Sequence, residues 1–222
     1  MMKIDILTIF PGFYQQFLET SIIHRAIRDG KVEINTHDLR DYAHNKHRQI
    51  DDTPYGGGVG MLMQFPPIYD AVNQLRTPET KVYLTSPQGK IFTQARANLL
   101  SNESHIILIC GHYEGVDARV ETLIDGELSI GDVVLTNGDI PAMVITDAIV
   151  RLIPDVIMEA SVKEDSLYDG LLKHPQYTKP ESYQGLDVPK VLLSGHHANI
   201  EKWRKEQKIE VTKKKRPELL KK

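Results

Sequence analysis

The chain has 222 residues, of which 41% are hydrophobic and 26% are charged, and its formal net charge is −3 at pH 7. This length and composition allow a full buried core, which argues against a disordered chain. Its single cysteine, Cys110, excludes an internal disulfide and a cysteine-based zinc cluster. Neither the basic region nor the long apolar stretch of a signal peptide occurs in the first residues, MMKIDILTIFPGF, so we expect a cytoplasmic protein with no membrane segment.

Charge is distributed unevenly along the chain. Residues 202–222 contain ten Lys and Arg against three Glu, a net charge of +7, so residues 1–201 carry −10. A basic segment on an acidic body favours a polyanionic partner that is met locally. On charge alone, a solvated C-terminal tail is an equally good interpretation.

Strands and helices alternate through the first 153 residues. Short apolar runs predict strands, and apolar residues at helical spacing predict helices. The predicted strands are 3–10, 32–39, 81–86, 105–110 and 131–136, and the predicted helices are 12–30, 66–75, 93–101, 116–124 and 143–153. This order predicts an α/β fold with a mainly parallel sheet that is covered on both faces. Cys110 ends one of these strands, so we expect a small buried side chain rather than a nucleophile.

The sequence changes character after Pro154. Four prolines, many charges and weak periodicity over 154–190 are typical of a linker that enters irregular structure. An amphipathic helix is then predicted over 196–211. We predict an α/β domain over 1–158, a flexible linker over 159–170, and a small, mostly helical C-terminal domain over 171–222.

Three glycine-bearing loops, at 55–61, 110–115 and 131–143, are candidate ligand sites. None of them matches the phosphate-binding patterns of P-loop or dinucleotide-binding proteins. The carboxyl ends of parallel strands are nevertheless where such sheets bind ligands. Together, these loops favour a pocket but do not name its ligand.

Three predicted strands run directly into Pro87, Gly111 and the Asn137-Gly138 pair. Asn and Gly both tolerate positive φ, so we expect a tight backbone joint at that pair. Exits of this kind present backbone N–H and C=O groups that suit a flat base such as adenine.

Several stretches, in the same order along nearly the whole chain, carry a family resemblance: IDILTIFPGF, DDTPYGGGVGM, TSPQG, CGHYEGVDAR, SIGDVVL, DSLYDGLLKHPQYTKP and LDVPKVLLSGHHANIEKWR. The chain resembles the bacterial tRNA (guanine-N1)-methyltransferases of the SPOUT superfamily, which methylate the guanine 3′ to the anticodon. The resemblance implies an α/β domain tied in a deep trefoil knot, which is an exception to the rule that chains do not thread loops. It also implies S-adenosyl-L-methionine (AdoMet) as methyl donor, tRNA as substrate, and a homodimer whose subunits share their active sites.

The resemblance gives roles to individual residues. Asp169 corresponds to the general base that removes the N1 proton of guanine, Arg151 to the arginine that stabilises charge on O6, and Glu114 to a further catalytic residue. The implied cofactor-binding residues are Ser86, Pro87, Gly111, Tyr113, Glu114, Gly115, Ser129, Ile130, Gly131, Asp132, Val133, Val134, Leu135, Gly138 and Pro141. The candidates for RNA contact are Asp52, His197, Trp203 and Arg204.

Some of these residues also suit plain structural roles. Asp169-Gly170 is a common turn dipeptide, Arg151 suits the last turn of a helix, and Glu114 suits a helix start. The spacing of His44 and His47 with the acids after them matches no standard metal site, so no metal ligand is predicted. The resemblance is compatible with Mg²⁺ but gives it no assignable site.

The chain departs from the usual family pattern at Asn137 and Asp139, where glycine and glutamate are usual, and at Val133, where an aromatic residue is common. Three functions follow as hypotheses: methylation of tRNA guanine N1, RNA binding without methyl transfer, and methylation of another target such as ribosomal RNA. A measurement of AdoMet-dependent methyl incorporation into RNA distinguishes the first hypothesis from the second. The C-terminal part, which resembles the tRNA-binding domain of the family, weighs against the third hypothesis.

Overall fold

The computed structural model describes residues 1–221, so Lys222 of the expected C-terminal domain lies outside the described residues. The chain divides into two compact units, a first unit over Met1–Ile157 and a second unit from Met158 onward. Each unit is described by itself below.

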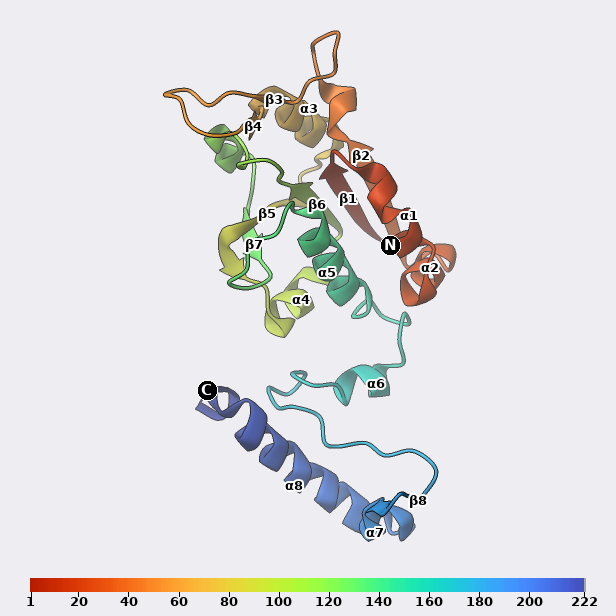
Figure 1. Ribbon diagram of the computed structural model, residues 1–222. Helices are drawn as coiled ribbons and strands as arrows, with labels where there is room; N and C mark the ends of the chain where they lie inside the picture. The colour runs from red at the N-terminus through yellow and green to blue at the C-terminus, as the bar shows by residue number, and fades with distance from the viewer. Residues whose placement is uncertain (222) are drawn as a thin grey trace. The chain divides into compact units, whose positions relative to one another are not determined.

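The first unit is built on a five-stranded sheet with the strand order β2-β1-β6-β5-β7 (Figure 1). All four pairings are parallel. The strands are β1 Met2–Thr8, β2 Val32–Asp38, β5 Thr80–Ile91, β6 His105–Cys110 and β7 Gly126–Ser129. The predicted α/β class with a mainly parallel sheet is confirmed, and the trefoil knot stays a prediction.

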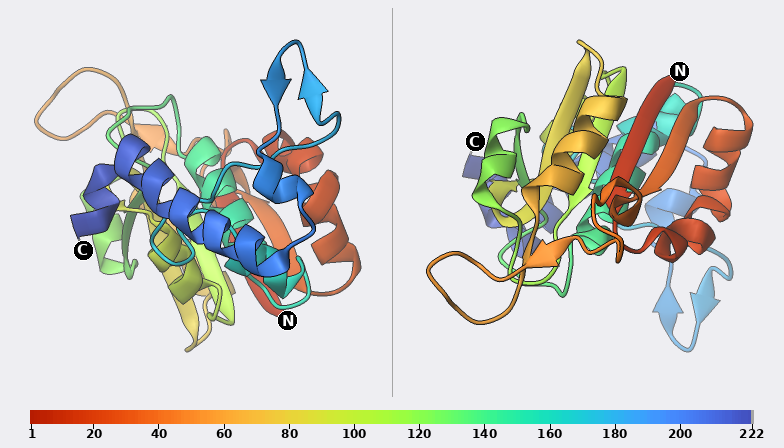
Figure 2. Two further views of the ribbon diagram at one scale, coloured as in Figure 1. Left: turned by 90° about the horizontal axis from the view of Figure 1, so that it is seen from below. Right: turned by 90° about the horizontal axis from the view of Figure 1, so that it is seen from above.

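Helices cover both faces of this sheet, as the right-hand view of Figure 2 shows for α3 and α5. Because successive side chains of a strand point to opposite faces, Ile106 and Leu108 of β6 pack on one side and Ile107 and Ile109 on the other. The first face lies under α2 Ser21–Arg28, α4 Gln94–Leu100 and α5 Asp139–Val150, and the second under α3 Phe65–Leu75 and the 3-10 helices Leu39–Tyr42 and Ala118–Thr122.

Several predicted elements differ from the structure, and the helix predicted over 116–124 is the 3-10 helix Ala118–Thr122. The helix predicted over 12–30 is broken into the 3-10 helix Pro11–Tyr14, α1 Gln15–Leu18 and α2. The strand predicted over 131–136 is wrong: this stretch is irregular, and Val133 and Val134 are 55% and 87% exposed. Its apolar residues face outward, and the preceding residues, β7, pair with β5 in the sheet instead.

Strand β5 is longer than predicted because its register shifts between Thr85 and Lys90. Ser86 and Pro87 lie in the resulting irregularity rather than beyond the end of the strand. A Cβ atom on Gly89 would lie 2.5 Å from the backbone of Glu127, so the close approach of these two strands requires glycine there.

The loop between β3 Asp51–Asp52 and β4 Leu62–Met63 extends away from the rest of the first unit (Figures 1 and 2). Tyr55 at its start is fully exposed, and four of its glycines have positive φ. The loop therefore depends on glycine for its backbone conformation.

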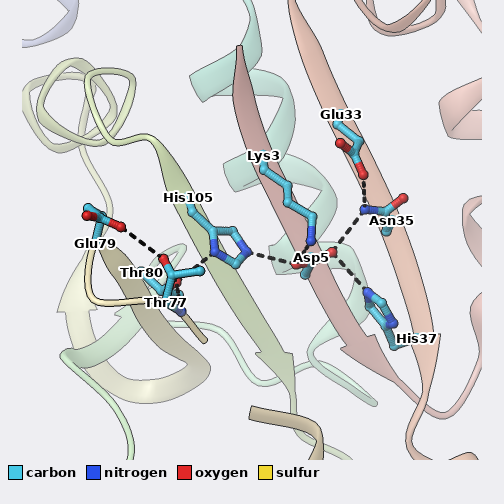
Figure 3. Close-up of polar contacts among 9 residues, drawn as sticks. All are labelled: Lys3, Asp5, Glu33, Asn35, His37, Thr77, Glu79, Thr80 and His105. Atoms are coloured by element: carbon cyan, nitrogen blue, oxygen red, sulfur yellow. Dashed lines mark hydrogen bonds and ion pairs between the residues drawn. The ribbon is translucent and has the colours of Figure 1, made fainter. Parts of the chain in front are cut away.

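A polar network runs across the sheet from the amino ends of β5 and β6 to β2, on the face that α3 covers (Figure 3). The Asp5 carboxylate is fully buried and accepts hydrogen bonds from Asn35 at 3.0 Å and Lys3 at 2.9 Å. It also contacts the ring nitrogens of His37 at 2.9 Å and His105 at 2.8 Å. Burial raises the pKa of Asp5, but these contacts outweigh burial and hold that pKa well below its ordinary value.

The same network continues to β5, where the other ring nitrogen of His105 lies 2.7 Å from Oγ1 of Thr80. This Thr-His-Asp order has the form of a nucleophile relay. The threonine oxygen, however, also accepts the Thr77 N–H at 2.8 Å, and all three relay side chains are buried. We therefore interpret it as a structural network.

The second unit is small and mostly helical, as predicted. Its elements are α6 Glu159–Lys163, a hairpin of β8 Ser182–Tyr183 and β9 Leu186–Asp187, α7 Lys190–Leu193, α8 His197–Lys215 and the 3-10 helix Pro217–Lys221. Helix α8 confirms the helix predicted over 196–211 and extends it by about one turn. Within residues 1–221, no helix has the length and apolar character to cross a membrane.

Candidate functional site

A pocket of about 440 Å³ lies in the first unit where the regular part of β5 and the strands β6 and β7 end. All the expected cofactor-binding residues line it except Gly131 and Asp132. The full lining is 84–88, 111–118, 127–130 and 133–138, with Glu121 and Pro141. A pocket of this size, at the carboxyl ends of parallel strands, is suited to a small organic ligand.

The joint at Gly138 closes one side of the pocket. Its N–H donates to the carbonyl of Gly111 at 2.8 Å, and a Cβ atom there would lie 2.0 Å from Oγ1 of Thr85. The joint does not use positive φ, since Gly138 has φ −85° and Asn137 also lacks positive φ. Glycine is required here because three segments meet too closely for a side chain.

Sequence reasoning missed Asp139 as a structural residue of this joint. Its buried carboxylate accepts hydrogen bonds from the hydroxyls of Thr8 at 2.5 Å and Tyr14 at 2.9 Å. Burial raises the pKa of Tyr14 and of Cys110, whose sulfur lies 3.3 Å from the Tyr14 hydroxyl. The prediction that Cys110 is a buried side chain is confirmed. The position of Asp139 as the first residue of helix α5 was the sequence signal that could have indicated its role.

The loop after β6 has a strained backbone. Tyr113 has φ 58°, which is uncommon for a side-chain-bearing residue, and Gly115 has φ 129°. His112 packs between the rings of Phe10, at 5.3 Å, and Tyr113, at 4.5 Å. Its buried Nδ1 has no hydrogen-bond partner among the described residues. Strain and an unpaired polar atom at one pocket wall are typical of a functional site.

Glu114 connects this loop to the glycine loop between β3 and β4. Its N–H donates to the Met61 carbonyl at 3.1 Å, and Met63 N–H donates to the Gly115 carbonyl at 3.0 Å. A Cβ atom on Gly60 would lie 2.4 Å from the Glu114 side chain. The missing side chain of Gly60 therefore leaves the space that the Glu114 side chain occupies.

The third wall is apolar and partly open to solvent. Val133, Val134 and Leu135 are 55%, 87% and 39% exposed. Gly131 and Asp132 turn the chain into this wall, and the Gly131 carbonyl accepts from the Ser129 hydroxyl at 3.0 Å. Apolar groups at a pocket mouth suit the flat face of a base or a second protein surface.

Arg151 is the residue that follows the last turn of α5, and its N–H donates to the Asp147 carbonyl at 3.1 Å. Among the expected RNA-contact residues, Asp52 lies in β3 and its carboxylate accepts the Thr53 N–H at 2.7 Å. Their proposed roles in the reaction and in RNA binding stay predictions.

Asp169 belongs to the second unit. Its Oδ1 accepts the Leu171 N–H at 3.2 Å, and its Oδ2 accepts a hydrogen bond from Nζ of Lys208. Partial burial raises the pKa of Asp169, but the contact with Lys208 and the Leu171 hydrogen bond outweigh burial and lower that pKa below its ordinary value. The carboxylate is therefore ionised at neutral pH, as a general base requires.

The other candidates for RNA contact lie on α8. His197 is the first residue of the helix, and the Trp203 ring lies 6.2 Å from the His174 ring. Arg204 pairs with Glu201 at 2.8 Å, while its buried Nε has no partner among the described residues. These side chains share one helix with the basic C-terminal end of the chain.

The pocket residues fit AdoMet. Backbone groups of the three loops line the pocket, a glycine cradle lets the chain approach closely, and the Glu127 carboxylate has a buried oxygen without a partner among residues 1–221. Such a lining suits the edges of adenine, the ribose and an amino-acid cation. In the described part of the chain, no group of three or more His, Cys, Asp or Glu side chains is arranged to hold a metal ion.

Comparison with known proteins places this geometry in a family. The family model of tRNA (guanine-1)-methyltransferase TrmD matches residues 2–222. A tRNA (guanine-N(1)-)-methyltransferase of Acholeplasma laidlawii is 59% identical over 99% of this chain and 90% of its own length. Relatives with the same name from Onion yellows phytoplasma and Staphylococcus aureus are 57% and 53% identical, over 99% and 100% of this chain and 91% of their own lengths. The chain therefore belongs to the tRNA (guanine-1)-methyltransferase TrmD family, and so to the SPOUT superfamily.

Proposed function

We propose that this enzyme transfers a methyl group from AdoMet to N1 of the guanine that lies 3′ to the anticodon in tRNA. The observation that carries the proposal is similarity over the full chain to proteins named tRNA (guanine-N(1)-)-methyltransferase. The pocket at the carboxyl ends of the strands supports it, because its size and backbone lining fit the methyl donor.

When bound, AdoMet supplies an electrophilic methyl group on a sulfonium that is its own leaving group. We propose that the loops at Ser86, Gly111 and Gly138 hold it by backbone hydrogen bonds. The apolar side chains of Ile130 and Leu135 cover the adenine. Gly131 and Asp132 shape the turn that presents this wall.

Guanine N1 carries a proton and is a poor nucleophile until the proton is removed. In the proposed mechanism, the Asp169 carboxylate accepts this proton, which contributes about 10²–10⁴ in rate. Negative charge then builds on O6, where the Arg151 guanidinium donates charge-assisted hydrogen bonds. Glu114 orients the guanine through its exocyclic groups.

The second unit contacts the tRNA in this proposal. Its basic α8 meets backbone phosphates, so affinity falls as salt rises. A homodimer with shared active sites is part of the proposal, supported by the exposed apolar residues Val133 and Val134 beside the pocket. The cytoplasm is the proposed location because the substrate is tRNA.

Transfer of labelled methyl from AdoMet to two tRNA transcripts tests the proposal. One transcript has guanine 3′ to the anticodon and the other has adenine there. We expect labelling of the first transcript alone. Binding of both transcripts with labelling of neither would instead indicate an RNA-binding protein without methyl transfer, and equal labelling would indicate another target atom.

A further inference from the structure

The segment that carries Asp169 forms its own hydrogen bonds and lies against α8. Leu167 N–H donates to the Leu171 carbonyl at 2.7 Å, which closes a turn around Asp169. Leu172 N–H then donates to Oγ1 of Thr212 at 2.9 Å. Thr212 is fully buried, so this bond fixes the segment on the helix.

Lys208 lies one helical turn before Thr212 and therefore on the same face of α8. The Thr212 hydroxyl donates to the Lys208 carbonyl at 2.7 Å, and Nζ of Lys208 donates to Oδ2 of Asp169. The Lys208 side chain is only 16% exposed, whereas the Asp169 side chain is 46% exposed. The Lys208 side chain is thus largely shielded from solvent, while the Asp169 side chain remains within reach of a substrate.

Lys208 is the charged group that α8 presents to Asp169. In the segment itself, Lys173 pairs with Asp165 at 3.9 Å and not with Asp169. Nearby on α8, Arg204 pairs with Glu201. In the part of the chain that the structure describes, the Asp169 carboxylate therefore accepts from the Lys208 ammonium, the Leu171 N–H and the N–H of Asp169 itself.

The geometry leaves Asp169 free to act. An ionised carboxylate has about four acceptor positions, two on each oxygen. Lys208 uses one on Oδ2, Leu171 uses one on Oδ1, and the N–H of Asp169 itself uses one more. The remaining position can still accept the proton of guanine N1, so the ion pair holds the carboxylate without blocking it.

We propose that Lys208 is a positioning residue for the methyl transfer, which holds the Asp169 carboxylate in one orientation. This inference rests on the proposed function, in which Asp169 is the base. A carboxylate on a turn without this tether would sample several rotamers, and a misplacement of about 1 Å can cost a hundredfold in rate.

The test is single-turnover methyl transfer to tRNA by Lys208→Met in the full chain. We expect the rate at saturating substrates to fall between about tenfold and a hundredfold, with the KM for tRNA and the Kd for AdoMet unchanged. Without the cation the pKa of Asp169 rises, so the acid limb of the rate profile moves to higher pH. Lys208→Arg restores most of the rate. Lys163→Met, which removes a lysine paired with Glu159 in the same unit, is the matched control.

Three results would overturn the inference. A raised KM with an unchanged rate would make Lys208 a phosphate contact, and an unchanged or faster rate would exclude positioning. An Asp169→Asn variant separates this from the proposed function: if it retains full activity, the base assignment itself fails. If Asp169→Asn lowers the rate to a residual but measurable value, adding Lys208→Met should cost little more, because residues that act through one another are not additive. A full additional loss is the third contrary result.

Discussion

The pocket end of the parallel sheet and the polar network around Asp5 are built from different chemical groups. At the pocket end, backbone groups and glycines line a pocket, and Gly138 has no room for a side chain. Further back in the sheet, the buried Asp5 carboxylate contacts polar side chains from three strands. Changes at the pocket end should therefore alter ligand binding and turnover, whereas changes in the polar network should alter stability alone.

The largest effect is expected from Gly138→Ala. The added Cβ must displace Thr85 or the Gly111 backbone, which costs about 3 kcal/mol. Because these residues line the pocket, we expect the AdoMet dissociation constant, measured by calorimetry, to rise about a hundredfold. Gly12→Ala is the matched control, since a Cβ there meets nothing within 4 Å. Equal AdoMet affinity in both variants would refute the close-approach explanation.

Asp5→Asn should lower the free energy of unfolding by about 2 kcal/mol at pH 7, because charged hydrogen bonds in a buried site are lost. The folded pKa of Asp5 lies below its ordinary value of 3.8, so this stabilisation is fully present above about pH 4 and is lost as the pH falls further. Urea unfolding should therefore show the stabilities of the two proteins converging as the pH falls below about 4.

The control for Asp5 is Asp29→Asn, which removes an exposed partner of Arg28 and should leave stability unchanged. AdoMet affinity should be the same in Asp5→Asn as in the parent protein. A weaker affinity at constant folding would show that the pocket end and the polar network are not independent.

Gly60→Ala should reduce the rate of methyl transfer about tenfold, which is about 1.4 kcal/mol, because its Cβ displaces the Glu114 side chain. Gly57→Ala is matched for backbone strain, since φ is 80° there and 82° at Gly60, but its Cβ meets nothing. Single-turnover kinetics of the two variants isolate the contact with Glu114. Equal losses would attribute the effect to backbone strain.

Tyr14→Phe should have the smallest effect, a loss of about 1 kcal/mol of stability, because one hydrogen bond to buried Asp139 is removed. Thermal unfolding measures it. An unchanged AdoMet affinity would show that Tyr14 contributes to stability alone. A large loss of affinity would show that the start of α5, where Asp139 lies, also supports the pocket.

Much of the fold was predictable because strand residues such as Ile106 to Ile109 form an uninterrupted apolar run, and such runs are typical of strands buried on both faces. The irregular stretch at Val133 and Val134 was not predictable, because the same apolar pattern also suits a pocket wall. Gly138 was identified from the sequence because glycine tolerates positive φ, whereas in the structure close packing against Thr85 is the reason for glycine there.

The sequence alone determined the alternation of strands and helices, the basic C-terminal end and the family, since each depends on local pattern or on residue identity along the chain. Only the tertiary structure decided that Glu114 fits beside Gly60, that Asp139 joins α5 to β1, and that Lys208 holds Asp169. The physical reason is that these contacts join residues 39 to 131 positions apart in the sequence, or depend on the absence of a side chain, and neither property leaves a periodic signal.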